Sequence, residues 1–422
     1  MSDDRLGPWL KGYPGARPPI ARADLAAQRW NVLAGDLPLP LAVLRSSALD
    51  HNIAWMQGFA AARGVQLAPH GKTTMSPQLF ARQLAAGAWG ITFASVFQLR
   101  TGVVEAGVRR ALIANQVQQR ADLDALAGLL AAYGDLQVAF LVDSTAQLAL
   151  IEAWHAQTPR APVLDVLLEI GVPGGRTGVR DHDAAVALAR ALRASTAVRL
   201  VGIECYEGLQ ASGDSARDEA HVDALLQRVA RVAEALDGED LFEAGEVIVS
   251  AGGSAVFDLV AARLPLALTR PVRPLLRSGC YVTHDHGHYQ RYVSAVNRRC
   301  GIVDGLRGAL ELWTEVQSVP EPGLALLSAG RRDVGFDAGL PLPLHHARSG
   351  ARACEPADAA WQVSALNDQH AYLRLGGGAR AVAVGDRIAL GIQHPCTTFD
   401  KWHWMPIVDD DYTVVDAVTI RF

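Results

Sequence analysis

The fold is decided by residues 41–95, LAVLRSSALDHNIAWMQGFAAARGVQLAPHGKTTMSPQLFARQLAAGAWGITFAS. Short apolar runs at 41–45, 65–69 and 90–95 alternate in this stretch with amphipathic segments at 47–63 and 76–87. Apolar runs of strand length that alternate with segments of helical periodicity are typical of repeated βα units around a parallel sheet. The stretch therefore predicts an α/β fold.

The same alternation continues to about residue 281. Further strands are expected at 111–115, 137–142, 163–170, 199–205, 246–250 and 275–281, and further helices at 119–133, 144–157, 181–196 and 215–236. If the 41–45 strand is set aside, eight strands fall within roughly 220 residues, the size of a (β/α)8 TIM barrel. A doubly wound sheet is the alternative.

After about residue 295 the sequence changes to short strands punctuated by Gly and Pro, which predicts a C-terminal all-β domain. The 41–45 strand can join this domain and make it discontinuous. We therefore expect a barrel over 46–290 and a β domain formed by 1–45 and 291–422.

Composition excludes several classes of protein. The chain has 422 residues, of which 50% are hydrophobic, and a net charge of −5. It is too apolar for a disordered chain and lacks the positive charge that nucleic-acid binding requires. The acidic start and the absence of an apolar run of membrane-spanning length predict a soluble, cytoplasmic protein with no membrane partner. Five widely spaced cysteines argue against a disulfide framework.

Lysine is almost missing from the sequence. Lys11, Lys72 and Lys401 are the only lysines among 39 basic residues. Unlike a guanidinium, an amine can lose its proton and form an imine. Lys72 follows the 65–69 strand, at the end of the barrel where active sites are built. We expect Lys72 to be a catalytic Schiff-base lysine, and a merely solvated lysine is the alternative.

A Schiff-base lysine suggests pyridoxal phosphate, which needs a cradle of backbone amides for its phosphate. Barrels commonly bind phosphate in the loops after strands seven and eight. The loop after the seventh strand reads SAGGS, residues 250–254. The eighth strand is expected to contain RSGCY, residues 277–281. The expected cofactor-binding residues are Gly252, Gly253, Ser254, Ser278, Gly279 and Tyr281, the last through its hydroxyl.

Other strand ends carry polar residues that face the same mouth. Arg176 and Tyr206 are expected to bind the cofactor ring or the substrate carboxylate, and hydrogen bonding between loops is the alternative. His70, two residues before Lys72, has no assigned role.

His394 and Cys396 are spaced i, i+2 at the end of a strand-like run. In an extended chain both side chains point to one face, and imidazole with thiolate favours zinc among the divalent metals. A catalytic zinc usually has three protein ligands, so this pair is incomplete. The rival cluster at His284, Asp285, His286 and His288 is expected to pack at the domain junction instead.

Seven motifs, taken together, resemble a known group of enzymes. They are APHGKTTMSP (68–77), GGRTGV (174–179), ECYEG (204–208), SAGGSAVFD (250–258), RSGCYVTHD (277–285), GRRDVGFDAGLP (330–341) and HPCTTFDKW (394–402). The chain resembles the D-serine dehydratase and D-threonine aldolase group of fold-type III pyridoxal phosphate enzymes, relatives of alanine racemase. The resemblance implies an alanine racemase-like barrel with a β domain, a homodimer, Lys72 as the Schiff-base lysine and His394 with Cys396 as the metal pair.

Within that group, the aldolases tend to carry an acidic residue where Cys396 stands. We therefore expect a lyase that uses pyridoxal phosphate and zinc, or another divalent metal, to dehydrate a D-3-hydroxyamino acid to a 2-oxo acid and ammonia. D-Serine, D-threonine and D-threo-3-hydroxyaspartate are the candidate substrates. The alternatives are retro-aldol cleavage to glycine and an aldehyde, and a non-catalytic protein that binds pyridoxal phosphate.

Overall fold

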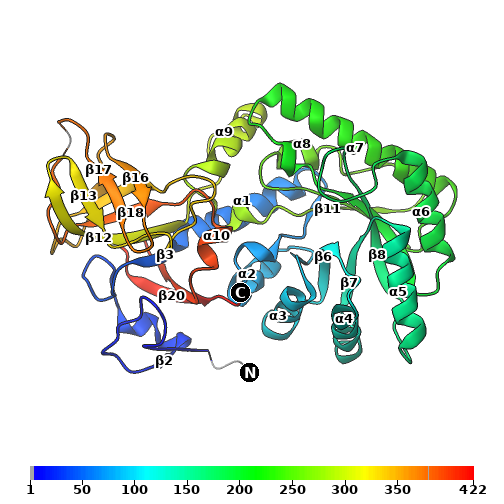
Figure 1. Ribbon diagram of the computed structural model, residues 1–422, viewed down its shortest axis with the longest axis horizontal. Helices are drawn as coiled ribbons and strands as arrows, with labels where there is room; N and C mark the ends of the chain where they lie inside the picture. Colours follow the sequence, from blue (N-terminus) through cyan, green and yellow to red (C-terminus); the bar gives the residue numbers. More distant parts are fainter. Residues whose placement is uncertain (1–3, 379) are drawn as a thin grey trace.

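The computed structural model describes residues 4–378 and 380–422, which form a barrel lobe and a β lobe (Figure 1). The barrel strands are β4 (Gln66–Leu67), β5 (Ile91–Phe93), β6 (Arg110–Gln116), β7 (Gln137–Val142), β8 (Leu164–Ile170), β9 (Val198–Cys205), β10 (Val247–Ala251) and β11 (Val272–Leu276). Every paired neighbour is parallel, in the order β4-β11-β10-β9-β8-β7-β6-β5.

The two ends of this sheet meet just beyond β4. His70 and Thr92 form a parallel bridge, and the hydroxyl of Thr92 donates to the carbonyl of Ala68 at 2.6 Å. These contacts join the first strand to the second and close the sheet. The predicted (β/α)8 barrel is confirmed, and the doubly wound sheet is excluded.

Helices surround the barrel. They are α1 (Ser46–Ala61), α2 (Pro77–Ala85), α3 (Val96–Ala106), α4 (Arg120–Ala132), α5 (Thr145–Gln157), α6 (His182–Ala194), α7 (Ser215–Gly238) and α8 (Phe257–Ala261). The start of α2 follows from its sequence, because the Ser76 hydroxyl accepts from the amide of Leu79 and Pro77 takes the first helical position. No helix in the described residues is long and apolar enough to cross a membrane.

The β lobe is a mainly antiparallel sheet built from both ends of the chain, with one parallel pair, β3 with β19. Its strands are β3 (Leu41–Arg45), β12 (Leu310–Glu321), β13 (Leu324–Leu327), β14 (Leu342–Ala347), β15 (Glu355–Pro356), β16 (Gln362–Leu366), β17 (Ala371–Arg374), β18 (Arg387–Gly391), β19 (Trp404–Val408) and β20 (Val414–Thr419). Because β3 pairs with β12 and β19, the 41–45 strand lies in this lobe, and the all-β domain is discontinuous as predicted.

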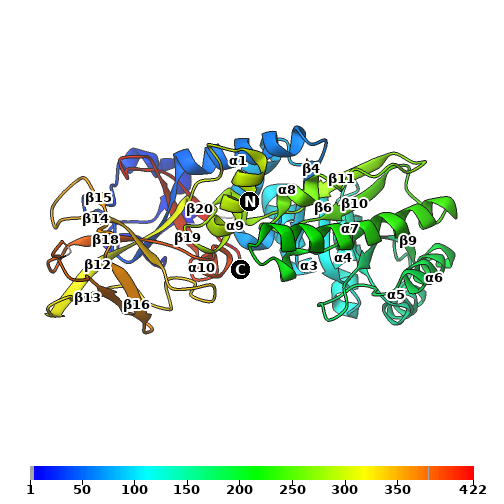
Figure 2. The same ribbon diagram turned by 90° about the horizontal axis from the view of Figure 1, so that it is seen from above.

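The small hairpin of β1 (Arg5–Leu6) and β2 (Ile20–Ala21) precedes β3. Its neighbour Arg22 binds Asp416 of β20 at 2.5 Å, so the N-terminal segment also packs on the β lobe. Helix α9 (His288–Cys300) and the short helix α10 (Cys396–Phe399) lie between the two lobes (Figure 2). The predicted boundary at residue 290 falls inside α9, and the domain limits stay a prediction.

Several elements differ from the sequence prediction for local reasons. The eighth strand ends at Leu276, so RSGCY does not lie in it, and Cys280–Val282 forms a 3-10 helix, η5. Helix α3 was not expected because Val, Thr and Gly weaken its helix propensity, and packing against the barrel outweighs this. Strands β14, β15 and β19 were not expected because each contains a proline, which argues against a strand.

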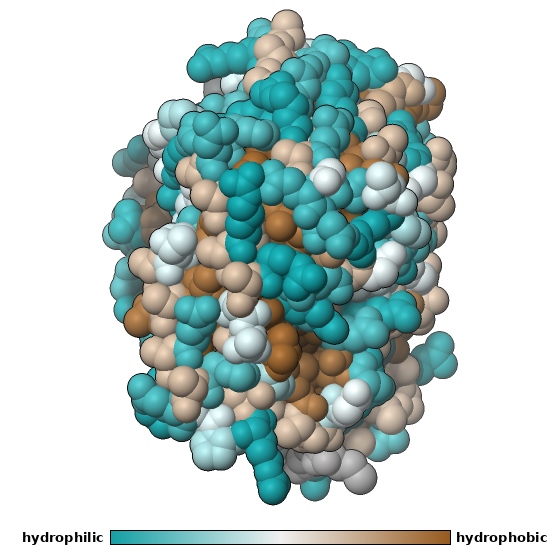
Figure 3. All heavy atoms as spheres, turned by 90° about the vertical axis from the view of Figure 1, so that its right-hand side faces the viewer, coloured by the Kyte–Doolittle hydropathy of each residue, from teal (hydrophilic) through white to brown (hydrophobic). Residues whose placement is uncertain are grey.

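The barrel end that faces the viewer in Figure 3 is mostly hydrophilic, and hydrophobic atoms show on it only in small separate groups. The apolar side chains are instead buried in the core. Phe80, Phe93 and Phe140 fill the barrel lobe, whereas Trp313, Trp402 and Trp404 fill the β lobe.

Candidate active site

A cavity of about 180 Å³ opens at the carboxyl ends of the barrel strands. It is lined by His70, Lys72, Ala94, Ala114, Asn115, Leu141, Glu169, Arg176, Glu204, Tyr206, Gly252 and Arg277. Loops that follow β4, β5, β8, β9, β10 and β11 all contribute residues. Barrel enzymes place their chemistry at this end, so we take this cavity as the candidate active site.

Lys72 lies in η3 (Gly71–Thr73), the short 3-10 helix after β4, and lines the cavity. The other two lysines are engaged in the β lobe. Lys11 binds Asp333 at 3.1 Å and lies 3.7 Å from the centre of the Trp402 ring, and Lys401 lies 3.8 Å from Asp400. Lys72 is therefore the lysine that reaches the cavity.

The loops after β10, β11 and β4 approach one another too closely for side chains. A Cβ atom on Gly279 would lie 2.5 Å from the carbonyl oxygen of His70. Gly252 has a φ of +119°, which L side chains rarely adopt. The close contact with His70 thus requires glycine at position 279, and the positive φ favours glycine at position 252.

Hydrogen bonds of serine side chains link the loop after β10 to the loop after β11. The Ser278 hydroxyl donates to the carbonyl of Gly253 at 2.7 Å, and the Ser254 hydroxyl accepts from the amide of Cys280 at 3.3 Å. The Gly253 amide donates to the buried carboxylate of Glu207 at 2.7 Å. This amide is already satisfied within the chain, so a phosphate would compete with Glu207 for it. Burial raises the pKa of Glu207.

The Tyr281 hydroxyl does not point to the expected place. It is buried and accepts a hydrogen bond from the Gln83 amide of α2 at 3.0 Å. The sequence prediction assumed that Tyr281 ended the eighth strand, but the residue lies in η5, where its ring packs into the core.

These residues fit pyridoxal phosphate. The cavity presents the amine of Lys72 beside glycine loops that leave no room for a Cβ atom. The guanidinium group of Arg176 supplies positive charge for an anionic group, whereas that of Arg277 is paired with Glu204. Gly252, Gly253, Ser254, Ser278 and Gly279 all belong to the loops that would hold the phosphate.

Arg277 and Glu204 form a buried ion pair that was missed in the sequence. A guanidinium nitrogen of Arg277 lies 2.6 Å from the carboxylate of Glu204, and both side chains are at most 4% exposed. Arg277 also donates to the hydroxyl of Ser250 and to the carbonyl of Cys205, at 2.7 and 3.0 Å. Burial raises the pKa of Glu204 to about 7. The signal was present in the sequence, because each charge stands at the end of an apolar run.

We expect Arg277→Met to lower the free energy of unfolding of the holoenzyme by about 3–5 kcal/mol, because it leaves Glu204 buried without a counter-charge. Burial raises the pKa of this carboxyl from 4.5 to about 7 in the folded protein. The folded state therefore holds the proton more tightly than the unfolded state, and stability falls as the pH rises from 4.5 through 7. The loss should therefore be larger at about pH 8 than at about pH 5.5. Urea unfolding measures it.

A matched control lies near the other end of β11, the strand that Arg277 directly follows. Arg273 pairs with Glu246 at the partly exposed end of β11, so Arg273→Met should lower the free energy of unfolding by less than about 1 kcal/mol. Equal losses for the two variants would contradict the prediction.

Arg176 and Tyr206 meet at the cavity wall. The guanidinium of Arg176 lies 5.1 Å from the centre of the Tyr206 ring. Burial raises the pKa of Tyr206 to about 12, so its hydroxyl keeps its proton at neutral pH and can donate it to a ligand. Arg176 is exposed and able to meet a carboxylate. Glu169, nearby, accepts from Thr177 at 2.6 Å and from Gln116 at 2.5 Å.

His70 lines the cavity as a neutral imidazole. Its Nδ1 atom is buried and finds no partner within residues 4–378 and 380–422, and burial holds its pKa well below the usual range. It can accept a hydrogen bond from a ligand, but the geometry assigns it no single role.

The segment with His394 and Cys396 is not extended as the i, i+2 argument assumed. Strand β18 ends at Gly391, Pro395 has helical backbone angles, and Cys396 begins α10. The argument from the alternation of side chains along a strand is therefore wrong for this pair. The residues still lie beside the cavity loop, because the Cys396 thiol is 3.5 Å from the hydroxyl of Thr73, the neighbour of Lys72.

Two further residues meet this pair. The Nδ1 atom of His394 lies 2.6 Å from the carboxylate of Asp337, and the sulfur of Cys280 lies 3.7 Å from that of Cys396. A hydrogen bond from Cys280 lowers the pKa of the Cys396 thiol. Sequence reasoning passed over Cys280 and Asp337, although both stand in the quoted motifs. Among the described residues, no three His, Cys, Asp or Glu side chains converge closely enough to hold a metal as they stand.

The rival histidine cluster packs at the junction of the lobes. The amide of His286 donates to the carbonyl of Ile392, and Asp285 accepts from three amides at the start of α9. His284 is buried, and its Nε2 atom lies 2.7 Å from the Oε1 atom of Gln290.

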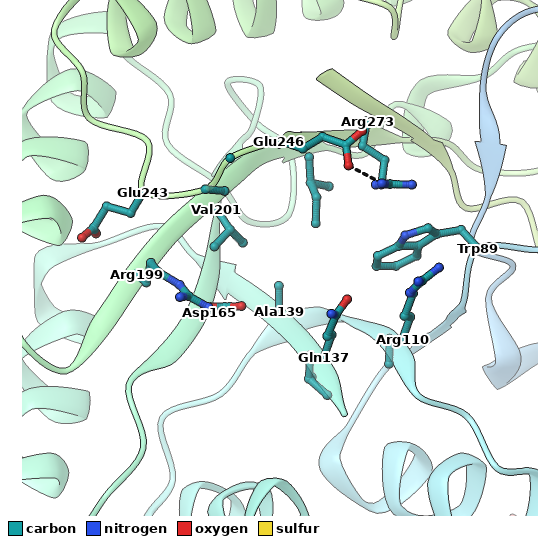
Figure 4. Close-up of a pocket in the computed structure, with 15 residues that line it drawn as sticks. Trp89, Arg110, Gln137, Ala139, Asp165, Arg199, Val201, Glu243, Glu246 and Arg273 are labelled. Atoms are coloured by element: carbon teal, nitrogen blue, oxygen red, sulfur yellow. Dashed lines mark hydrogen bonds and ion pairs between the residues drawn. The ribbon is translucent and has the colours of Figure 1, made fainter. Parts of the chain in front are cut away.

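A second cavity, of about 460 Å³, lies at the opposite end of the barrel (Figure 4). Its walls carry ion pairs between Arg199 and Asp165, at 2.7 Å, and between Arg273 and Glu246. These residues stand where the barrel strands begin, an end of the fold associated with stability, and we assign no activity to them.

Comparison with known proteins agrees with this fold. The family model "Alanine racemase, N-terminal domain" matches residues 44–271, and the model "Putative serine dehydratase domain" matches residues 309–408. The D-threonine aldolase of Arthrobacter sp. is 28% identical over 94% of this chain and 93% of its own length. The D-threo-3-hydroxyaspartate dehydratase of Delftia sp. strain HT23 is 29% identical over 86% of this chain and 92% of its own.

Solved structures share the fold. The crystal structure of the D-threonine aldolase of Filomicrobium marinum matches with a TM-score of 0.75 and 25% identity, over 91% of this chain and 95% of that one. A metal-free form of the D-threo-3-hydroxyaspartate dehydratase, in which a cysteine is replaced by alanine, matches with a TM-score of 0.72 and 23% identity, over 93% of this chain and 99% of that one.

Proposed function

The chain belongs to the alanine racemase-like, fold-type III family of pyridoxal phosphate enzymes, and from this premise we propose that it dehydrates a D-3-hydroxyamino acid to a 2-oxo acid and ammonia, using pyridoxal phosphate and zinc. One observation carries the proposal. The Cys396 thiol lies 3.5 Å from the hydroxyl of Thr73, next to Lys72, so a metal held by His394 and Cys396 would stand beside the reactive lysine.

One solved relative supports a metal-dependent reaction. In the D-threo-3-hydroxyaspartate dehydratase, the form in which a cysteine is replaced by alanine is described as metal-free. In this chain, Cys396 is the cysteine of the β lobe that meets the cavity loop. Thiolate and imidazole donors favour zinc over harder divalent ions.

Each group then has a defined task. When bound, pyridoxal phosphate supplies an electron sink for the charge that develops at Cα, and zinc supplies a Lewis acid for the β-hydroxyl oxygen. The amine of Lys72 removes the proton from Cα. Arg176 binds the substrate carboxylate, and the neutral Tyr206 hydroxyl donates a hydrogen bond within the cavity. The loops that carry Gly252, Gly253, Ser254, Ser278 and Gly279 would hold the phosphate.

Retro-aldol cleavage is the second candidate, because the Arthrobacter relative that covers 94% of this chain is an aldolase. That reaction needs a base for the β-hydroxyl proton, and a thiolate committed to zinc is a poor one. Dehydration instead takes its proton from Cα, through Lys72, and the metal would draw charge from the C–O bond. The cysteine at position 396 therefore favours dehydration.

D-Threonine separates the two reactions. We expect the purified enzyme to convert it to 2-oxobutyrate and ammonia, measured by chromatography of the products, while L-threonine under the same conditions stays intact. D-Serine and D-threo-3-hydroxyaspartate, tested in parallel, rank the substrates by kcat/KM. Glycine and acetaldehyde as the main products would instead establish the aldolase. The homodimer and the cytoplasmic location remain predictions.

A further inference from the structure

Cys280 and Cys396 come from different lobes and meet beside the cavity. Cys280 lies in η5 of the barrel lobe, Cys396 begins α10 of the β lobe, and 116 positions separate them in the sequence. Both thiols are reduced, and their sulfur atoms are 3.7 Å apart. The hydroxyl of Thr73 lies 3.9 Å from the first sulfur and 3.5 Å from the second. No disulfide joins them.

The distance between the sulfur atoms suits two ligands of one metal. Zinc binds thiolate at about 2.3 Å with tetrahedral geometry, which places two bound sulfur atoms about 3.8 Å apart. The observed 3.7 Å matches this spacing without any movement of the backbone. We propose that Cys280 is a third protein ligand, and that the metal site consists of Cys280, Cys396 and His394. This inference rests on the metal-dependent function proposed above.

His394 is the remaining donor of the proposed site. Its Nδ1 atom is held by the carboxylate of Asp337 at 2.6 Å, and that carboxylate also accepts from the Thr397 hydroxyl at 2.6 Å. A carboxylate on one ring nitrogen fixes the tautomer and leaves the other nitrogen for a metal. Because the three donors do not converge as they stand, metal binding would require the imidazole to turn toward the two sulfur atoms.

With Cys280, the proposed zinc site has the three protein ligands that the pair of His394 and Cys396 lacked. A set of two cysteines and one histidine is a known catalytic zinc arrangement that leaves a fourth position open for substrate oxygen or water. Two thiolates also favour zinc over magnesium or manganese. Since the sulfur atoms belong to different lobes, the metal would join the η5 loop of the barrel to α10 of the β lobe.

Metal binding tests the third ligand without reference to turnover. We expect Cys280→Ser to weaken zinc binding by about a hundredfold or more, measured by competition with a chromophoric chelator, since even partners outside the ligand shell change affinity 10–100-fold. In the cobalt-substituted protein, absorption from sulfur-to-metal charge transfer should fall to about half, because one of two thiolates is lost. Cys354→Ser, at a cysteine of the β lobe outside the site, is the matched control and should change neither quantity.

X-ray absorption of the zinc-loaded unmodified protein avoids any dependence on the variant's folding. Two sulfur ligands per zinc support the proposal. One sulfur ligand, with unchanged zinc affinity in Cys280→Ser, would overturn it while leaving the pair of His394 and Cys396 and the proposed function intact. If the unmodified protein bound no zinc at all, both the third ligand and the metal-dependent function would fail.

Discussion

Replacement of Lys72 by alanine is expected to abolish turnover of every D-3-hydroxyamino acid that the enzyme accepts. The reason is that Lys72 is the one lysine that reaches the cavity at the carboxyl ends of the strands. The change removes both the covalent anchor of the cofactor and the amine that moves the Cα proton. General acid–base catalysis alone contributes 10²–10⁴-fold, so kcat/KM should fall by more than about a thousandfold.

Two measurements accompany this kinetic result. Borohydride should trap the cofactor on a peptide that contains Lys72 in the unmodified enzyme and trap none in Lys72→Ala. Lys72→Arg should behave like the alanine variant, because a guanidinium keeps the charge but forms no imine. Lys11→Arg is the control, since arginine can keep the contacts with Asp333 and Trp402, and it should retain full activity. Label found on Lys11 or Lys401 would refute the assignment.

The second large effect should follow the loss of the metal. Cys396→Ala is expected to lower kcat for dehydration by on the order of a thousandfold, because the β-hydroxyl then leaves without a Lewis acid. Chelation of the unmodified enzyme should have the same effect, and added zinc should restore turnover. The visible absorption of the cofactor should persist in both cases, since Lys72 and the glycine loops are unchanged.

This combination of results separates metal loss from misfolding. A misfolded variant would also lose the cofactor absorption, whereas a variant that lacks only the metal would keep it. His394→Ala should reproduce Cys396→Ala, and Cys354→Ser should behave like the unmodified enzyme. Full activity of a verified metal-free sample would remove zinc from the mechanism.

The buried ion pair of the cavity wall affects the stability of the protein as well as the environment of the active site. Arg277 and Glu204 are nearly inaccessible, yet they share the cavity wall with Lys72. A charged pair held in a dry environment is sensitive to the loss of either member. Variants of the active site should therefore be compared only after their unfolding has been measured.

Much of this protein could be predicted from the sequence by itself. The alternation of apolar runs with amphipathic segments determined the parallel barrel, because each period of hydrophobicity reflects which face of a local element is buried. The position of Lys72 at a strand end followed from the same pattern. The strands of the β lobe without proline were also found, since turn residues mark their ends.

Only the tertiary structure decided which loops meet. The bridge between His70 and Thr92 closes the barrel, the Tyr281 hydroxyl bonds to Gln83, and Arg277 pairs with Glu204. Cys280 lies beside Cys396 because α10 of the β lobe packs against the loops of the barrel. Local periodicity carries no information about such contacts, because they depend on how two separately patterned lobes fit together and on turns whose backbone angles are set by packing.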